Sequence, residues 1–184
     1  MPTTLTRVLP DGYRIRGLHL SDAPALADAY RRNRAHLEPW EPVREESFFG
    51  AAGQLTAASA LLGLAQQGLA VPWVLTCGDA VVGRVNLTNV VHGVMRSGTL
   101  GYWVDADHLG RGLASAAVEF ACDQARQRGL HRVEAGTMLH NTASQRVLER
   151  CGFEPYGMAP RLLFIAGAWR DHRLYQRILH DDPL

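Results

Sequence analysis

Two glycines flank one arginine at the beginning of a helical stretch, in the segment DHLGRGLASAAVEFA. When a strand leads into such a turn, free backbone N–H groups converge at the positive end of the helix dipole. This arrangement binds phosphate groups, and Gly110 and Gly112 let the backbone approach closely because they lack a Cβ. Arg111 can add positive charge. Taken alone, the pattern also fits an ordinary turn with Arg111 in solvent, so it only opens the hypothesis of a phosphate site.

Two phosphate-binding families can be compared with this turn. A P-loop requires GxxxxGK[ST], which the chain does not contain, and this excludes a P-loop nucleotide hydrolase. The dinucleotide pattern GxGxxG is met in its first half, with Ser115 at the third glycine position and Glu134 about twenty residues further on. This interpretation predicts an oxidoreductase and stays as an alternative. It is weakened because Glu134 lies inside a predicted strand and because no βαβ unit precedes the turn.

A second motif, NTASQRVLERCGF at 141–153, combines an apolar stripe with a polar edge. The stripe, at helical spacing, consists of Ala143, Val147, Leu148 and Cys151. Asn141 and Ser144 lie on the opposite edge. Asn141 is a good N-cap for the helix, and the Ser144 hydroxyl can either be solvated or take part in chemistry. The segment alone leaves both interpretations open.

The elements that must position these motifs alternate along the chain. Residues 13–18 alternate as a strand, Ser21 and Asp22 signal a helix through 33, and Ser47 is predicted to cap a second helix to about residue 67. The rest is predicted as an antiparallel meander at 72–77, 81–91 and 97–105, helix 112–128, strand 131–138, helix 142–151 ended by Gly152, and strands 162–166 and 169–179. We expect an α/β (α+β) protein whose mixed, mostly antiparallel central sheet is flanked by helices, as one domain over residues 1–184.

Composition excludes several classes of protein. The 184 residues, 47% hydrophobic and 20% charged, suffice for one core, and a net charge of +1 gives no basic excess for binding nucleic acid. No apolar run reaches the roughly 20 residues that span a bilayer, and the N-terminus lacks a secretory signal, so we expect a cytoplasmic protein without membrane contact. Cys77, Cys122 and Cys151 and the eight histidines show no metal-ligand spacing, which predicts buried free thiols and no metal.

The order of these motifs carries a family resemblance. GYWVDADHLGRGLASAAVEFA, then HNTASQRVLERCGFEPYG, then GAWRDHRLYQRIL is similar to the GNAT acyltransferase superfamily, and specifically to its ribosomal-protein N-terminal acetyltransferase branch of the RimJ/RimL type. The resemblance implies the GNAT fold, acetyl-CoA as co-substrate, and acetyl transfer to an amine, in particular a protein N-terminus. A relative that binds CoA without turnover is a further alternative. A homodimer is expected only at the level of the family.

The resemblance also implies roles for particular residues. The superfamily motif Q/R-x-x-G-x-G/A, which holds the pyrophosphate of acetyl-CoA, is matched here with a departure at its first position. The implied pyrophosphate site consists of Leu109, Gly110, Arg111, Gly112, Leu113, Ala114 and Ser115. The backbone of Trp103 and Val104 is expected to pair with the pantetheine arm as a neighbouring strand would, with Asn141 beside it. In this branch the serine of N-x-x-S is thought to protonate the leaving thiolate, which nominates Ser144, with Asn141, as catalytic.

The acceptor site is implied by the segment HLEPWEPV and by residues of the sheet. The nominated residues are Trp40, Glu41, Arg44, Asn86 and Tyr102. Simpler interpretations remain, since Trp40 and Tyr102 fit core or rim aromatics, and Asp171 of the WRDH pattern fits a turn cap as well as a catalytic residue. RLLFIAG lacks the acidic residue that members of the branch often carry there, so the base is unassigned. This favours an α-amine, whose ordinary pKa is about 7.7 to 8.0, over a lysine.

Overall fold

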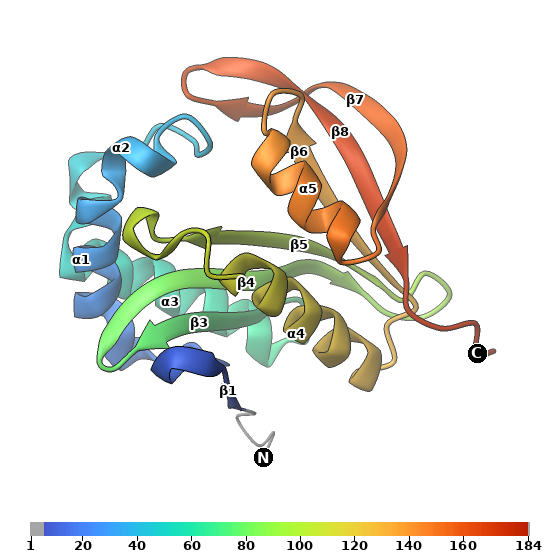
Figure 1. Cartoon of the computed structure of the whole chain (residues 1–184), viewed down its shortest axis with the longest axis horizontal. Helices are drawn as coiled ribbons and strands as arrows, with labels where there is room; N and C mark the ends of the chain where they lie inside the picture. Colours follow the sequence, from blue (N-terminus) through green and yellow to red (C-terminus); the bar gives the residue numbers. More distant parts are fainter. Residues whose placement is uncertain (1–5, 184) are drawn as a thin grey trace.

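The computed structural model describes residues 6–183 and contains one sheet with helices on both of its faces (Figure 1). The strands are β1 (Arg7–Val8), β2 (Tyr13–Gly17), β3 (Val71–Cys77), β4 (Ala80–Val91), β5 (Ser97–Val104), β6 (Arg132–Met138), β7 (Glu154–Ile165) and β8 (Ala168–Ile178). Their order across this 8-stranded sheet is β1-β2-β3-β4-β5-β6-β8-β7. Neighbouring strands are antiparallel except β5 and β6, which are parallel. This is the mixed, mostly antiparallel sheet that the sequence predicts.

Two hydrophobic layers hold the helices to the sheet. The helices are α1 (Ala23–Arg32), α2 (Arg34–Leu37), α3 (Ala51–Gln66), α4 (Leu113–Gln127) and α5 (Thr142–Arg150). Leu26 of α1 and Ala58 of α3 pack with Val74 of β3 on one face. Phe120 of α4 and Leu148 of α5 belong to the cluster on the other face, which is the larger of the two. The centre of the sheet is therefore covered by helices on both faces (Figure 1), whereas β7 at its edge is mostly exposed. Within residues 6–183, no helix is both long enough and apolar enough to cross a membrane.

The second helix begins later than the sequence predicts. Ser47 lies in a separate 3₁₀ turn, Glu46–Phe49, and α3 starts at Ala51 with Gly50 as its N-cap. The turn packs so closely on the helix that a Cβ at Gly53 would stand 2.1 Å from the Ser47 carbonyl oxygen. The prediction missed this because the close approach depends on a contact between two turns, which local residue preferences do not reveal.

The strand predicted at 162–166 is the end of a much longer strand. β7 starts at Glu154 and pairs with β8 along its length, with irregular register between Pro155 and Gly157 and between Ala159 and Leu163. Prolines argue against a strand in a sequence because they cannot donate to the ladder. β7 is an edge strand, where one side needs no donor, and the bulges absorb the irregular stretch.

Two smaller predictions about burial also need correction. Ala143 was placed on the apolar stripe of α5, but the structure leaves it exposed beside a cleft, whereas Leu148 and Cys151 are buried as expected. Cys77 is a free thiol, but it is only half-buried, because it ends β3 near the rim of the sheet. Cys122 and Cys151 are free and buried, as predicted.

Candidate active site

The turn between β5 and α4 has the backbone conformation of a phosphate cradle. Gly110 and Gly112 have φ values of +75° and +74°, in the left-handed region that favours glycine. Gly112 is the N-cap of α4 and no side chain caps that end, so the first N–H groups of the helix point outward. A Cβ on either glycine would meet no described atom within 4 Å. The glycines are therefore needed for the conformation of the turn, and the space in front of it is open to a ligand.

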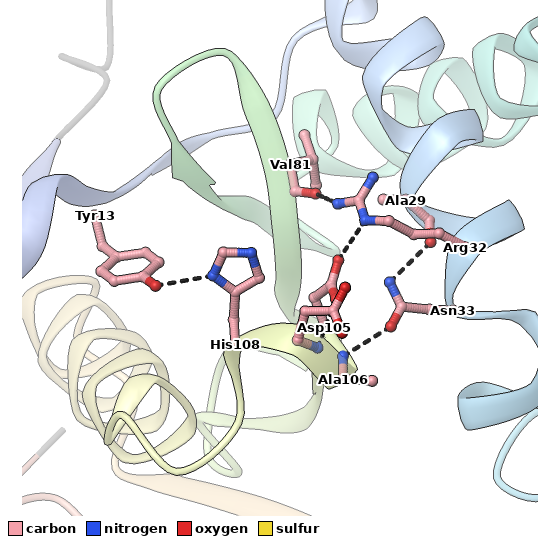
Figure 2. Close-up of polar contacts among 9 residues, drawn as sticks. Tyr13, Ala29, Arg32, Asn33, Val81, Asp105, Ala106 and His108 are labelled. Carbon is pink, nitrogen blue, oxygen red and sulfur yellow. Dashed lines mark hydrogen bonds and ion pairs between the residues drawn. The ribbon is translucent and has the colours of Figure 1, made fainter.

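α1 and its C-cap Asn33 hold the beginning of this turn through part-buried polar contacts (Figure 2). Arg32 Nε donates to Asp105 Oδ2 at 2.6 Å, and Arg32 Nη2 donates to the Val81 carbonyl oxygen at 2.5 Å. The Ala106 N–H donates to Asn33 Oδ1 at 2.8 Å. Burial acts to raise the pKa of Asp105, but hydrogen bonding by its polar neighbours outweighs burial and lowers that pKa. Asp105 is thus held as a carboxylate at the point where β5 leaves the sheet.

β2 holds the next residues of the turn. Tyr13 Oη and His108 Nδ1 lie 2.8 Å apart, and the two rings meet edge to face (Figure 2). The segment that leads into the glycines is therefore tied to two elements that lie far away in the sequence. Such ties reduce the freedom that the turn would lose on binding a ligand.

β5 separates from β6 at the level of the predicted pantetheine site. The two strands pair only where Ser97–Thr99 meet 132–134, whereas β5 continues to Val104. On its other edge β5 stays paired with β4 as far as Val104. The β6-facing backbone of residues 100–104 therefore has no strand partner in residues 6–183. An extended ligand that carries amide groups fits there as an added strand, beside Trp103 and Val104 as the sequence predicts.

Ser144 lies in the first turn of α5, with its hydroxyl on Tyr102. Asn141 is the N-cap of the helix, and its Oδ1 accepts the Ser144 N–H at 3.1 Å. Ser144 Oγ is 2.9 Å from Tyr102 Oη. Burial raises the pKa of Tyr102 to about 12, so this phenol stays protonated at neutral pH and can donate to Ser144 Oγ. Tyr102 was nominated for the acceptor, whereas its hydroxyl stands beside the nominated proton donor.

One cleft of about 830 Å³ brings the two predicted sites together. From the cofactor set it is lined by Trp103, Val104, Leu109, Ala114 and Asn141, from the acceptor set by Trp40, Glu41, Arg44, Asn86 and Tyr102, and it also contains Ser144, nominated as catalytic. The remaining residues of the cofactor set do not line this cleft. They are the four residues between Leu109 and Ala114, together with Ser115. Leu113 is 5% exposed, so only its backbone is available to a ligand, and the Ser115 carbonyl oxygen accepts from Cys151 Sγ at 3.7 Å.

The loop after α2 carries the residues nominated for the acceptor and lines one part of the cleft. The ring of Trp40 lies 5.3 Å from the ring of His140, which connects this loop to the segment before α5. The Ala166 N–H donates to the Glu41 carbonyl oxygen at 3.1 Å, which connects the loop to the β7–β8 turn. A second cavity of about 460 Å³ lies on the far side of the loop and is also lined by Glu41 and Arg44. Glu41 therefore stands between the two cavities.

The sequence identified no base for the reaction. Glu41 places a carboxyl group in the cleft that could take this role. Burial raises the pKa of Glu41, and the positive charges of Arg44 and Arg84 offset this only in part. The sequence nominated Glu41 for recognition of the acceptor but not for proton transfer. Arg84, which also lines the cleft, was not nominated at all. Its signal was a charged residue inside the otherwise apolar strand segment VVGRVNL.

The structure assigns a local role to the aspartate of the WRDH pattern. Asp171 Oδ1 accepts the Arg161 N–H at 2.8 Å, and Arg161 has a φ of +50°. This contact is the capping alternative, and it stabilises the irregular stretch of β7.

The structure shows no cluster of potential metal ligands in its described part. No three His, Cys, Asp or Glu side chains of residues 6–183 lie close enough together to hold a metal ion.

Comparison with known proteins shows the family. The acetyltransferase (GNAT) domain family matches residues 13–154. The chain is 37% identical over 171 residues to the [ribosomal protein uS5]-alanine N-acetyltransferase of Escherichia coli (strain K12), across 91% of this chain and 88% of that protein. The ribosomal-protein-S5-alanine acetyltransferase from Vibrio fischeri superposes with a TM-score of 0.91 at 32% identity, over 97% of this chain and 100% of that one. Mycobacterium smegmatis RimJ, in complex with CoA-disulfide, superposes with a TM-score of 0.88 at 33% identity, over 95% and 86%.

The chain therefore belongs to the GNAT acetyltransferase family. Within it, the chain is an acetyl-CoA-dependent N-acetyltransferase of the RimJ/RimL-like type. These findings confirm the fold class, the family and the co-substrate that the sequence predicts. They do not favour the oxidoreductase or the relative without turnover.

Proposed function

We propose that this enzyme acetylates the N-terminal α-amine of a protein, with ribosomal proteins as the substrate class. The observation that carries the proposal is the single cleft lined by Ser144 and the free edge of β5 at one end and by Glu41 and Trp40 at the other. An α-amine at the end of a chain can enter such a cleft without unfolding its protein. The names of the relatives, which are alanine N-acetyltransferases of ribosomal protein S5, support the same class.

The cofactor residues fit acetyl-CoA by their backbone more than by their side chains. The outward N–H groups of α4 and the left-handed Gly110 and Gly112 suit a pyrophosphate, with exposed Arg111 adding charge. Leu109, where the family motif carries Gln or Arg, contributes only apolar surface. The free edge of β5 at Trp103 and Val104 suits the two amides of the pantetheine arm. Acetyl-CoA supplies the acyl group as a thioester, and the chain supplies position and protons.

Two side chains handle the protons of the reaction. Glu41 takes a proton from the ammonium group, and the neutral nitrogen then forms the new C–N bond as the C–S bond breaks. Ser144 gives its hydroxyl proton to the departing sulfur and regains one, through water, from the new amide nitrogen, which loses its extra proton as the C–N bond forms. Glu41 returns the proton it took to the solvent. We assign Tyr102, which burial keeps protonated, as the donor in its hydrogen bond with Ser144 Oγ, so that the serine's own proton is directed towards the leaving group. A thiol has a pKa of about 8 to 9, so the leaving group needs only modest help from the acid.

The proposal is tested with a panel of synthetic acceptors. Purified enzyme and acetyl-CoA are incubated with an alanine-initiated peptide, the same peptide with its α-amine blocked, and the blocked peptide carrying an internal lysine. Thiol release and mass spectrometry should show one added acetyl group on the free peptide and none on the two blocked ones. Acetylation of the internal lysine, or thiol release without an acetylated product, would overturn the proposal.

The setting of this reaction is part of the proposal. Ribosomal proteins are made in the cytoplasm, so we place the enzyme there. A homodimer is supported by the exposed apolar side chains of the β7–β8 hairpin, among them Met158, Phe164 and Trp169. Light scattering after size exclusion tests it, and a monomer over a wide range of concentration would contradict it.

A further inference from the structure

Arg84 and Asn86 stand two residues apart on β4, and both line the cleft. Side chains at i and i+2 of a strand lie on one face of the sheet. Here it is the face covered by α1, because Arg84 Nη1 donates to Tyr30 Oη at 3.3 Å. In the register of the sheet, Arg84 is opposite Trp103 and Asn86 is opposite Gly101. On the β5 side, the position beside Asn86 therefore has no side chain, which leaves that side of the wall open.

Arg84 is a buried cation that makes no direct ion pair in the described residues, although its charge acts on the Glu41 carboxyl of the same cleft. It is 8% exposed, and it forms no ion pair within residues 6–183. Its Nε is buried and has no hydrogen-bond partner in the described part of the chain. Buried charges are normally paired and hydrogen-bonded because an unpaired one is costly. A buried guanidinium in a cleft wall is thus suited to an oxygen atom that comes from a ligand.

Asn86 offers the opposite group in the same wall. Its Oδ1 is buried and likewise has no partner among residues 6–183. The two side chains together present one unpaired donor and one unpaired acceptor, and a ligand that fits both must carry an oxygen close to an N–H group. The first residue of a peptide has this pattern, because its α-amine and its carbonyl group are attached to the same carbon.

We propose that Arg84 and Asn86 bind the backbone of the acceptor's first residue, with the guanidinium on its carbonyl oxygen and Asn86 Oδ1 on its α-amine N–H. The inference rests on the proposed function and deepens it, since it assigns the groups that select an α-amine. A lysine amine has no carbonyl on the adjacent carbon and would leave Arg84 unpaired. Sites built to hydrogen-bond a group strongly reject analogues that lack it.

Three acceptors test whether Arg84 requires an oxygen atom next to the amine. All three have the same branched carbon bonded to the nitrogen. An alanyl peptide amide has a carbonyl, free alanine has a carboxylate, and isopropylamine has neither. Each is assayed by thiol release with the wild type, Arg84→Met, Arg84→Lys and the control Arg14→Met, which changes an exposed arginine of β2. Comparing each variant with the wild type on the same acceptor cancels the different amine pKa values. Calorimetry measures the Kd of acetyl-CoA in parallel.

We expect Arg84→Met to lower kcat/KM for the alanyl peptide by about 10- to 100-fold more than for isopropylamine and to leave the Kd of acetyl-CoA unchanged. Arg84→Lys should recover part of the loss, and Arg14→Met should resemble the wild type. A partly unfolded variant loses activity on all acceptors equally, so the ratio of peptide to isopropylamine remains diagnostic. An unchanged ratio in Arg84→Met overturns the inference while leaving the proposed function intact. A wild type that prefers free alanine to the peptide overturns both.

Discussion

Ser144 is held in a way that separates its chemical role from its structural one. Its backbone N–H binds the capping Asn141, whereas its hydroxyl bonds to Tyr102. Ser144→Ala therefore keeps the cap and removes only the proton donor. We expect kcat to fall about 10- to 1000-fold with the Kd of acetyl-CoA nearly unchanged, as for an interaction made mainly in the transition state. Steady-state thiol release beside calorimetric titration measures both quantities.

Tyr102→Phe is the matched control for this prediction. It keeps the ring in the cleft wall and removes only the hydroxyl that orients Ser144, so it should lower kcat less than Ser144→Ala. A Ser144→Ala enzyme with the kcat of the wild type would leave water as the proton source. Lower affinity for acetyl-CoA with normal kcat would make the hydroxyl a ground-state ligand instead.

The role of Glu41 as a base can be tested by measuring how the activity lost in Glu41→Gln depends on pH. An acceptor α-amine has a pKa of about 7.7 to 8.0, so it needs a base below that range and needs none well above it. Glu41→Gln should therefore lower kcat/KM by about 100-fold near pH 7 and by much less near pH 9. Rates for the alanyl peptide across this range measure the effect. A deficit that stays constant from pH 7 to about pH 9 would limit Glu41 to a binding role.

Stability gives an independent check on the same substitution. Burial raises the pKa of Glu41 in the folded protein, so the stability it contributes is present below its unfolded pKa and is lost as pH rises through the folded value. Glu41→Gln lacks this loss. Its melting temperature relative to the wild type should thus be higher at about pH 8 than at about pH 4. Glu45→Gln, which changes an exposed carboxylate four residues away, should show no such trend.

The sequence predicted those site residues that share a short motif. Asn141 and Ser144 lie one helical turn apart, so their joint position at the start of α5 follows from local spacing. Arg84 and Glu41 come from different segments, and only the packing of the α2 loop against β4 brings them to one cleft. Nothing local reveals that Arg84 makes no ion pair within residues 6–183, because this depends on which distant segments pack around it.

At the scale of elements, the glycine turn between β5 and α4 depends on its backbone conformation more than on its side chains. Gly112→Asp places a carboxylate in the cradle and forces a side chain into a left-handed conformation. Arg111→Ala removes one exposed charge, and exposed charge pairs contribute little in salt. We expect Gly112→Asp to weaken acetyl-CoA binding far more than Arg111→Ala, as measured by calorimetry on folded protein. The reverse order would mean that the arginine side chain holds the phosphates.

The same turn shows where element prediction succeeds and where it stops. The start of α4 was predicted because glycines and an alanine-rich run signal it locally. The contacts from Arg32 and Asn33 of the α1 region to Asp105 and Ala106 were not predicted, since they join segments about seventy residues apart in the printed sequence. They connect the helix that precedes the Trp40 loop to the start of the glycine turn. Only the last part of β7 was predicted, and its first part was missed for a different reason, because its prolines conceal an edge strand.

At the scale of the whole molecule, the cleft exists because one pair of strands is parallel. Antiparallel neighbours could have continued the meander, but β6 follows the α4 crossover and pairs with β5 only at its beginning. The two strands then diverge, and α5 follows β6 on one side of the opening (Figure 1). The order of helices and strands was predictable from periodicity. The extent of the pairing, which decides whether there is a site, depends on twist and packing that no local pattern encodes.

The layer of α4 and α5 should open as a unit, and its cysteines can report this. Cys122 and Cys151 are 2% and 3% exposed, and burial raises the pKa of both, that of Cys122 to about 12. Because the thiolate is the reactive form, iodoacetamide should modify half-buried Cys77 first and the other two only after unfolding. If that opening also dismantles the cradle on α4, acetyl-CoA at a hundred times its Kd should slow the labelling of Cys122 about 100-fold. Peptide mass spectrometry over a time course measures the labelling of each cysteine. Two results would show that the layer opens locally while the cofactor stays bound: labelling of Cys122 as fast as that of Cys77, or labelling of Cys122 that acetyl-CoA does not slow.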